Sequence, residues 1–146
     1  MNNSNSDTQR CSLPTLTDKH IQIEDEWRER VKDIPAELSQ LAIVKGAPFT
    51  TSIGLLRAVA QFSRENNIDE WVATTDNKVI RLLNGYYYFG LPKIGPPVKY
   101  LGSDSTPVLI NIEQSIQNAE SEKSSALMAR FLRGEDVEGF EWYTGV

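Results

Sequence analysis

Two polar side chains stand at the start of a mostly apolar run from residue 36 to residue 44. In an extended chain alternate side chains share a face, so Glu37 and Ser39 would lie side by side on one face of a strand. A carboxylate can remove a proton, and a hydroxyl can donate a hydrogen bond to a substrate oxygen. A glutamate at the start of a strand can equally be a solvated carboxylate without a chemical role. The residues alone leave both interpretations open.

The other reactive side chains are few. Cys11 is the only cysteine and His20 the only histidine. A single cysteine excludes an intramolecular disulfide, which fits a reducing cytoplasm, and a single histidine offers no multi-histidine metal site. Neither residue lies in a motif that places a base or a further ligand beside it. We therefore expect no metal centre and assign no catalytic role to either residue.

Hydrophobic periodicity predicts the elements that would position Glu37 and Ser39. In chain order they are a helix over 25–33 that Pro35 ends, a strand over 36–44, a helix from Thr50 to about Asn67, a strand over 70–75, and a helix capped by Asp76 that uses Val79, Ile80, Leu82 and Leu83. A strand, helix and strand joined at this length usually form a right-handed parallel unit. The strands at 36–44 and 70–75 should therefore be neighbours in one sheet.

The remaining segments complete the predicted organisation. Two consecutive prolines in Ile94-Gly95-Pro96-Pro97 turn the chain, and strands at 98–101 and 107–112 should follow as a hairpin or wide bend. Leu127, Phe131 and Leu132 predict a packed helix over 124–133. The expected division is a disordered tail over 1–17, a core over 18–120, and a carboxyl-terminal helix with an acidic tail over 121–146.

Length and charge bound the function. A chain of 146 residues holds one domain, and no apolar run approaches the roughly 20 residues of a membrane-spanning helix. The polar start lacks the pattern of a secretory signal, so we expect a soluble, cytoplasmic protein. The net charge of −5 argues against nucleic-acid binding. Residues 37–112 hold six acidic and seven basic side chains, a balance that suits an anionic ligand or an ordinary solvated surface.

Three pieces of sequence carry a resemblance. They are Pro35-Ala36-Glu37-Leu38-Ser39-Gln40-Leu41-Ala42-Ile43, then Trp71-Val72-Ala73-Thr74-Thr75-Asp76 with Arg81-Leu82-Leu83, and finally Ile94-Gly95-Pro96-Pro97-Val98-Lys99-Tyr100-Leu101-Gly102. In this order they resemble acyl-homoserine-lactone synthases and N-acyl amino acid synthases over about residues 35–115. The resemblance implies an α/β (α+β) fold of the GNAT type, with a mixed twisted sheet and flanking helices. The strands at 36–44 and 70–75 would splay apart to admit the arm of an acyl thioester.

The resemblance also implies an activity. Such enzymes move an acyl group from an acyl carrier protein or acyl-CoA to the amine of an amino acid or homoserine-lactone-like acceptor, with no permanently bound cofactor. The acyl-phosphopantetheine or acyl-CoA is the donor substrate. By this resemblance the catalytic residues are Glu37 and Ser39, the substrate-binding residues are Gln40, Leu41, Ala42, Thr74 and Thr75, and the acyl pocket contains Phe62, Leu82 and Leu83.

Two departures from the family keep other functions open. Gln40 stands where the family usually has an arginine, and glutamine lacks the permanent charge and the fork of donors. Only 36 residues precede Glu37, whereas the family places about half a domain there. The chain is therefore an N-acyltransferase, a noncatalytic remnant that acts as a binding module, or a homo-oligomer in which a second copy completes the sheet.

Overall fold

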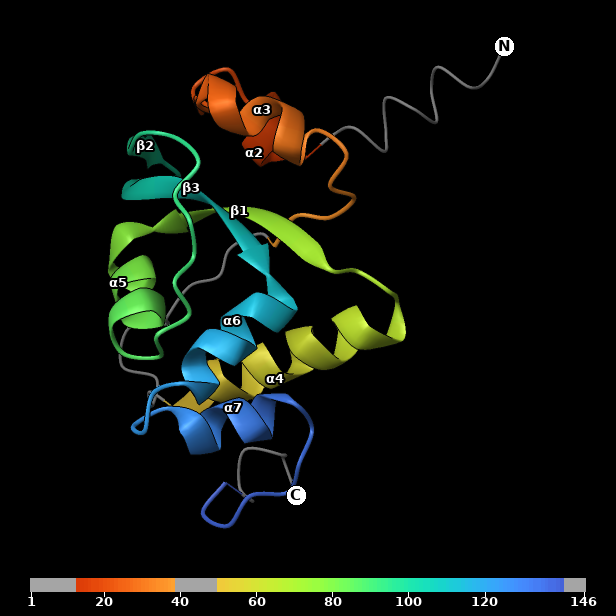
Figure 1. The fold of residues 1–146 in the computed structure, drawn as a ribbon. Coiled ribbons are helices and arrows are strands. Elements are labelled where there is room, and N and C mark those ends of the chain that lie inside the picture. Colours follow the sequence, from red (N-terminus) through yellow and green to blue (C-terminus); the bar gives the residue numbers. More distant parts are fainter. Residues whose placement is uncertain (1–12, 39–49, 141–146) are drawn as a thin grey trace.

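The computed structural model describes residues 13–38 and 50–140 (Figure 1). Within these ranges a small sheet lies between two groups of helices. The elements are α2 (Pro14–Thr17), α3 (Asp25–Val31), α4 (Thr50–Glu65), β1 (Glu70–Asp76), α5 (Asn77–Gly85), β2 (Val98–Tyr100), β3 (Ser103–Asn111), α6 (Ile112–Glu120) and α7 (Ala126–Leu132). The fold is a mixed α and β architecture, which confirms the predicted class at this level.

The sheet has the strand order β1-β3-β2, and both pairs are antiparallel. β1 pairs with β3 over its whole length, from Glu70 opposite Asn111 to Asp76 opposite Ser105. Beyond β2, the chain at Lys93 bridges to Val108 on the same outer edge of β3. β3 is therefore the central strand, and it begins four residues before the predicted start at Pro107.

One more pairing adds a short parallel segment to the other edge of β1. The Val72 N–H donates to the Ala36 carbonyl at 3.1 Å, and the Leu38 N–H donates to the Val72 carbonyl at 3.0 Å. Glu37 lies opposite Val72 in this parallel bridge. The predicted parallel neighbours are therefore confirmed over 36–38, whereas Ser39 and the rest of the predicted strand to Val44 lie outside the described residues.

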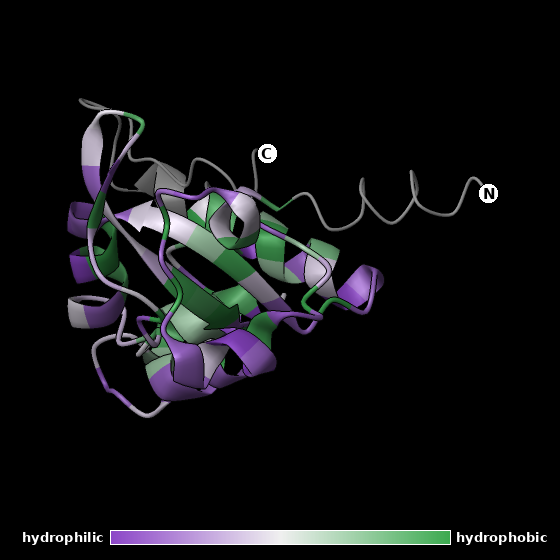
Figure 2. Ribbon diagram, turned by 90° about the horizontal axis from the view of Figure 1, so that it is seen from above, coloured by the Kyte–Doolittle hydropathy of each residue, from purple (hydrophilic) through white to green (hydrophobic). Residues whose placement is uncertain are grey.

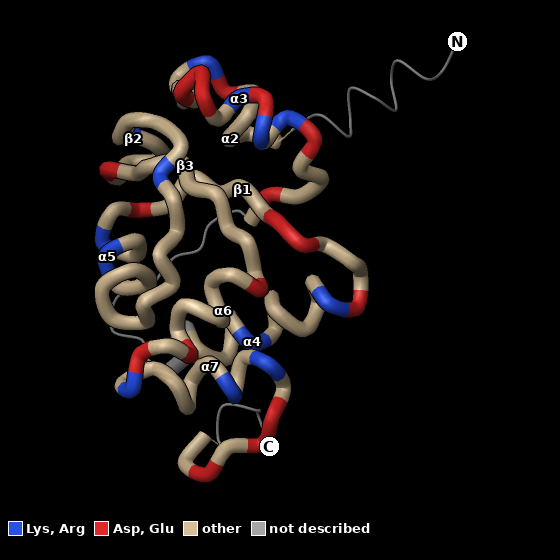
Figure 3. Tube along the Cα trace, in the orientation of Figure 1, with Lys and Arg blue, Asp and Glu red and all other residues tan. Residues whose placement is uncertain are grey.

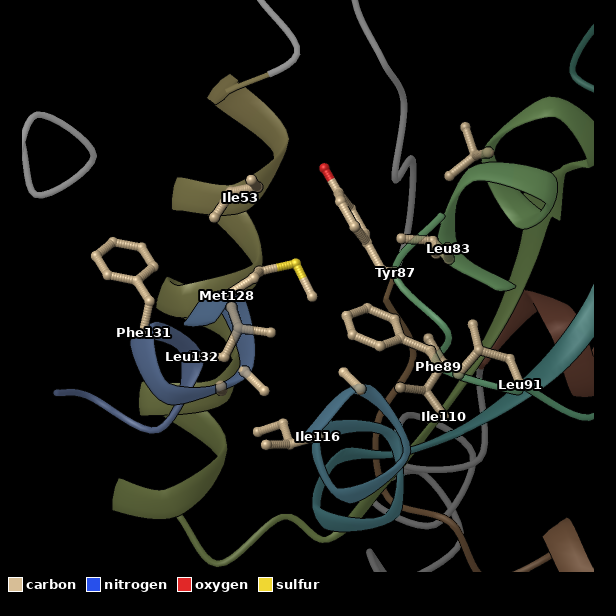
Figure 4. Close-up of a cluster of buried hydrophobic side chains, with 14 of the residues drawn as sticks. Ile53, Leu83, Tyr87, Phe89, Leu91, Ile110, Ile116, Met128, Phe131 and Leu132 are labelled. Atoms are coloured by element: carbon tan, nitrogen blue, oxygen red, sulfur yellow. The ribbon is translucent and has the colours of Figure 1, made fainter. Parts of the chain in front are cut away.

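The sheet separates two apolar cores, and alternation along each strand decides which residue joins which core. Trp71 and Ala73 face the larger core with Val108 and Ile110, under α4, α5, α6 and α7. Figure 4 shows side chains of this core converging from α4 and α7 on one side and from the 83–91 segment on the other. Apolar residues accordingly lie along the strands and on the inward faces of the helices in Figure 2.

The smaller core covers the opposite face of the sheet. Its buried members are Ile21, Ile23, Val31, Ile34, Val72, Ile94 and Leu109. They come from the sheet, from the turn at Ile94, and from the amino-terminal layer, by which we mean residues 13–34 with α2 and α3. Figure 1 shows this layer on the far side of the sheet from α4 and α7.

Backbone contacts fasten the amino-terminal layer to the Gly-Pro-Pro turn. The Glu24 N–H donates to the Ile94 carbonyl at 2.9 Å. A Cβ on Gly95 would lie 1.9 Å from the Gln22 carbonyl oxygen, a separation that no side chain tolerates. Glycine is thus required at residue 95 by close approach of two backbones, and the predicted turn also serves as the docking point of residues 22–24.

Local capping explains where the helices start. The Asp76 carboxylate accepts from the Lys78 N–H at 2.7 Å and begins α5, as the sequence predicted. The Asn111 side chain accepts from the Gln114 N–H at 2.9 Å and begins α6 in the same way. α6 was not among the predicted elements, because the apolar end of β3 continues into Ile112 without a break. The predicted helix at 124–133 is present as α7.

The predicted tail over 1–17 is wrong for its last five residues. Pro14–Thr17 forms the helix α2, and the side chain of Thr15 is fully buried. Leu13 and Leu16 pack against the smaller core and supply the apolar contacts that a count over the local sequence does not show. Residues 1–12 of the predicted tail lie outside the described part of the chain.

Candidate functional site

The candidate site is built around Glu37, which lies on the short parallel segment beside β1. Because Glu37 is opposite Val72, its side chain shares the face of Val72 and points toward the amino-terminal layer. Its Oε1 accepts a hydrogen bond from the backbone N–H of Thr15 at 2.7 Å. The carboxylate of Glu37 therefore satisfies a free N–H in the first turn of α2, although 22 residues separate the partners.

Thr74 completes a cluster of three residues. It follows Val72 by two positions on β1 and so projects to the same face of the sheet. Its hydroxyl oxygen lies 2.8 Å from the hydroxyl oxygen of Thr15, and either group can be the donor. We call Thr15, Glu37 and Thr74 the Glu37 cluster.

Burial sets the electrostatics of the cluster. It raises the pKa of the half-buried Glu37 carboxyl, although the hydrogen bonds from Thr15 act in the opposite direction. The pKa of Tyr100, on β2, is also raised, first by burial and then by the negative charges of Glu37 and Asp18. A carboxyl whose pKa is raised is a stronger proton acceptor than an ordinary glutamate once it is ionised.

Within the described residues, the edge of β1 next to the cluster is paired only at Val72. The N–H and C=O of Val72 both bond to the 36–38 segment. Backbone groups alternate in direction along a strand, so the N–H and C=O of Thr74 point to the same edge. No residue within 13–38 or 50–140 hydrogen-bonds to them there. The predicted residues that would continue the parallel segment, Ser39, Gln40, Leu41 and Ala42, lie outside the described ranges.

Thr74 and Thr75 were predicted together, and the structure separates them. Thr75 is buried on the opposite face of the sheet, because adjacent residues of a strand point to opposite sides. Of the two threonines, only Thr74 shares the face of Glu37 and is linked to it through Thr15. The Thr75 side chain faces the larger core.

Of the three predicted acyl-pocket residues, only one lines an apolar cavity in the described part of the chain. Leu83 lines an apolar cavity of about 40 Å³ together with Leu38, Phe89 and Leu91. Phe62 is half exposed on α4, where its ring lies 6.2 Å from that of Trp71, and neither Phe62 nor Leu82 lines the cavity. Leu38 brings the cavity to the parallel segment, on the face opposite to that of Glu37.

The larger hollows of the described chain are not continuous with the Glu37 cluster. One of about 490 Å³ has polar walls that include Arg64, Asn111 and Arg133. Another of about 500 Å³ is lined by Tyr86, Tyr88 and other residues at the ends of α5 and α7. In Figure 3 the charged residues lie mainly on helices and loops. Arg133, for example, forms ion pairs with Glu113 and Glu120.

Sequence reasoning missed Thr15, although a signal was present. Pro14 occupies the first position of α2, the helical position that proline favours. A proline there could have predicted the short helix. The hydrogen bonds of Thr15 with Glu37 and Thr74 depend on the tertiary fold, and no pattern in the local sequence indicates them.

Two absences apply to residues 13–38 and 50–140. They contain no helix long and apolar enough to cross a membrane, and they bring no three His, Cys, Asp or Glu side chains together in a way that could hold a metal ion. Comparisons give no relative: no protein-family model, curated protein or solved structure matches the chain.

Proposed function

We propose that this protein is a cytoplasmic N-acyltransferase with a GNAT-like fold. It transfers an acyl group from an acyl carrier protein or acyl-CoA to the amine of an amino acid or homoserine-lactone-like acceptor. The observation that carries the proposal is the half-buried Glu37 carboxylate, whose pKa is raised, on a segment parallel to β1 and linked to Thr74 through Thr15. A proton acceptor at this position suits the deprotonation of an amine.

The reaction follows from the chemistry of a thioester and an amine. The amine nitrogen attacks the thioester carbonyl carbon, and its proton passes to Glu37 directly or through a water molecule. The tetrahedral adduct then collapses, which breaks the carbon–sulfur bond. The leaving thiolate takes the proton from Glu37, so the products are an amide and a free thiol, and the carboxylate is regenerated.

The edge of β1 supports a position for the donor. In the described chain the parallel pair is joined at Val72 alone, and no described residue accepts a hydrogen bond from the Thr74 N–H at the same edge. A backbone N–H fixed in a strand is a suitable donor to the carbonyl oxygen of a thioester arm. Leu38 and Leu83 line the apolar cavity on the other face, where an acyl tail would begin to enter. In this proposal Ser39, Gln40, Leu41 and Ala42 lie along the donor.

One contact favours a second candidate, a noncatalytic binding module. The Thr15 N–H already occupies Glu37 Oε1, so this carboxylate has a structural role as a cap of α2. In that case the GNAT-like chain would bind a thioester ligand without turning it over.

A product assay separates the two candidates. The full chain is incubated with acyl-CoA or an acylated carrier protein and with homoserine lactone or single amino acids, and the N-acyl product is detected by mass. Glu37→Gln should lower the rate by roughly 10²- to 10⁴-fold, the usual contribution of a general base. Glu29→Gln is the matched control, because Glu29 is an exposed α3 residue paired with Lys32.

Two results would overturn the acyltransferase proposal. One is no product with any acceptor while the thioester still binds, which favours the binding module. The other is a rate for Glu37→Gln equal to that of Glu29→Gln. Sedimentation of the same samples tests the oligomer that the sequence left open, because a monomer at every concentration excludes a required second copy.

A further inference from the structure

We propose that α2 is an internal plug that occupies the acceptor subsite of Glu37 and must move away before an amine can bind. This inference rests on the acyltransferase proposed above and adds a regulatory contact to the same site. It starts from what Thr15 does in the Glu37 cluster, where its N–H donates to Glu37 Oε1 at 2.7 Å and its hydroxyl lies 2.8 Å from that of Thr74.

Thr15 presents the atoms that an acceptor would present. Its nitrogen and its hydroxyl oxygen are joined through two carbons, and the amine nitrogen and carboxyl or lactone oxygen of an α-amino acid or homoserine lactone are spaced by the same number of bonds. The nitrogen of Thr15 meets the carboxylate that would remove the amine proton. The oxygen meets Thr74, which would hold the acceptor oxygen. α2 thus blocks the subsite and makes the hydrogen bonds expected of the acceptor.

Burial of Thr15 supports this interpretation. Thr15 has no exposed surface, whereas Thr17, on the same helix, is exposed. An acceptor that bonds to Glu37 Oε1 and to the Thr74 hydroxyl in the way that Thr15 does would take the place of Thr15. In this proposal Thr15 and the acceptor bind the same two groups, so the plug and the acceptor compete.

The attachment of α2 is separate from that of the segment after it. α2 has four residues, and its apolar contacts come from the partly buried Leu13 and Leu16. The rest of the layer is held by the buried side chain of Ile21 and by the contacts of residues 22–24 with the Gly-Pro-Pro turn. Lys19 and His20 between them are exposed. Because the two attachments are separate, in this proposal α2 leaves while residues 21–34 stay in place.

The test places a like charge against Glu37 in the full chain. Thr15→Asp sets a second carboxylate beside that of Glu37 and should release α2. Thr17→Asp introduces the same charge at the exposed position of the same helix and is the matched control. Because the plug competes with the acceptor, Thr15→Asp should lower the KM for homoserine lactone by at least about 10-fold with little change in kcat, whereas Thr17→Asp should leave both unchanged.

Hydrogen exchange provides a readout that does not depend on activity. In Thr15→Asp the Asp18 amide, which bonds to the Pro14 carbonyl in α2, should lose protection, while the Glu24 amide bonded to Ile94 keeps it. Hydrogen exchange that shows α2 released, together with a KM equal to that of the parent, would overturn the plug proposal and leave the acyltransferase proposal intact. Release of α2 with no product from the parent or from any variant would overturn the acyltransferase proposal, and the plug proposal with it.

A milder variant covers the case in which Thr15→Asp does not fold. Thr15→Val keeps the size and the N–H and removes only the hydroxyl bond to Thr74. The loss of one buried hydrogen bond should lower the KM for the acceptor by roughly 2- to 10-fold. An unchanged KM in a folded Thr15→Val protein would overturn the proposal.

Discussion

Gly95 lies directly against the backbone of Gln22, so that a Cβ at residue 95 would fall 1.9 Å from the Gln22 carbonyl oxygen and 2.9 Å from Pro107 Cγ. Neither neighbour is the free end of a flexible side chain. Gly95→Ala should therefore push the amino-terminal layer away from the turn and lower the free energy of unfolding by about 1–3 kcal/mol, the usual range for overpacking. Urea denaturation measures the change.

Gly85→Ala is the control for that substitution. Gly85 ends α5, and a Cβ there would meet no atom within 4 Å. This change should be neutral or should stabilise the fold by up to roughly 1 kcal/mol, because alanine favours a helix over glycine. Equal effects of the two substitutions would contradict the close approach at Gly95.

Ser63 gives a second stability prediction. Its buried hydroxyl accepts a hydrogen bond from the Trp71 Nε1–H at 2.9 Å and donates to the Val59 carbonyl at 2.7 Å. Ser63→Ala leaves the indole N–H without its acceptor and should cost about 1–3 kcal/mol of unfolding free energy. Ser121→Ala removes an exposed serine hydroxyl and should cost much less. Thermal unfolding of both variants tests the difference.

The ion pair between Arg30 and Glu70 predicts one part of the pH dependence of stability. The pKa of Glu70 is lowered, first by its hydrogen bonds with Arg30. A lowered pKa in the folded state gives stability that is present above the ordinary glutamate value of about 4.3 and is lost as the pH falls through the folded pKa. The Arg30 side chain is 49% exposed, so we expect at most about 1 kcal/mol.

Glu70→Gln should remove that contribution. Its unfolding free energy, measured by urea denaturation between about pH 2 and pH 7, should approach that of the parent as the pH falls. A constant difference across this range would show that the pair adds nothing through ionisation.

The contribution of Glu37 to stability depends on pH in the opposite direction from that of Glu70. Its pKa is raised in the folded protein, mainly by burial, so its contribution to stability is fully present below the ordinary glutamate pKa and is lost as the pH rises through the folded pKa. Relative to Glu37→Gln, the parent should lose stability over that window. The proposed acylation needs the ionised carboxylate, so kcat/KM should rise with pH through the same raised pKa.

Carboxyl NMR titration of Glu37 checks this prediction directly. Its midpoint should lie above about 4.3 and should coincide with the midpoint of the stability difference. A midpoint at or below that value would contradict the effect of burial at this site.

Several elements could be predicted because their signals are local. Asp76 caps α5, an apolar stripe marks α4, and β1 was placed within one residue of its observed end. β3 was predicted too short because Pro107 looked like the start of a strand. In the fold the Pro107 nitrogen faces the edge between Ile94 and β2, and its carbonyl accepts from the Ile94 N–H, so the strand needs no donor there.

The site was less accessible to prediction, for physical reasons. Glu37 and Thr74 share one face of the sheet, and Thr75 lies on the other. This arrangement depends on the register of the parallel segment, which places Glu37 opposite Val72. Thr15 belongs to the cluster through two hydrogen bonds that span 22 and 59 residues of chain. No local window contains both partners of such bonds.

The division of the interior by the sheet has a consequence for partial unfolding. The smaller core has seven buried residues and is closed by a layer that contains only short helices, whereas the larger core has nineteen. Loss of the layer exposes only the smaller core, so it should need less free energy than global unfolding. The amides of α3 should then exchange through a local opening, and the rate of that exchange should depend less on temperature than the exchange of the β1 and β3 amides. The protein would behave as two cooperative units joined at a common sheet.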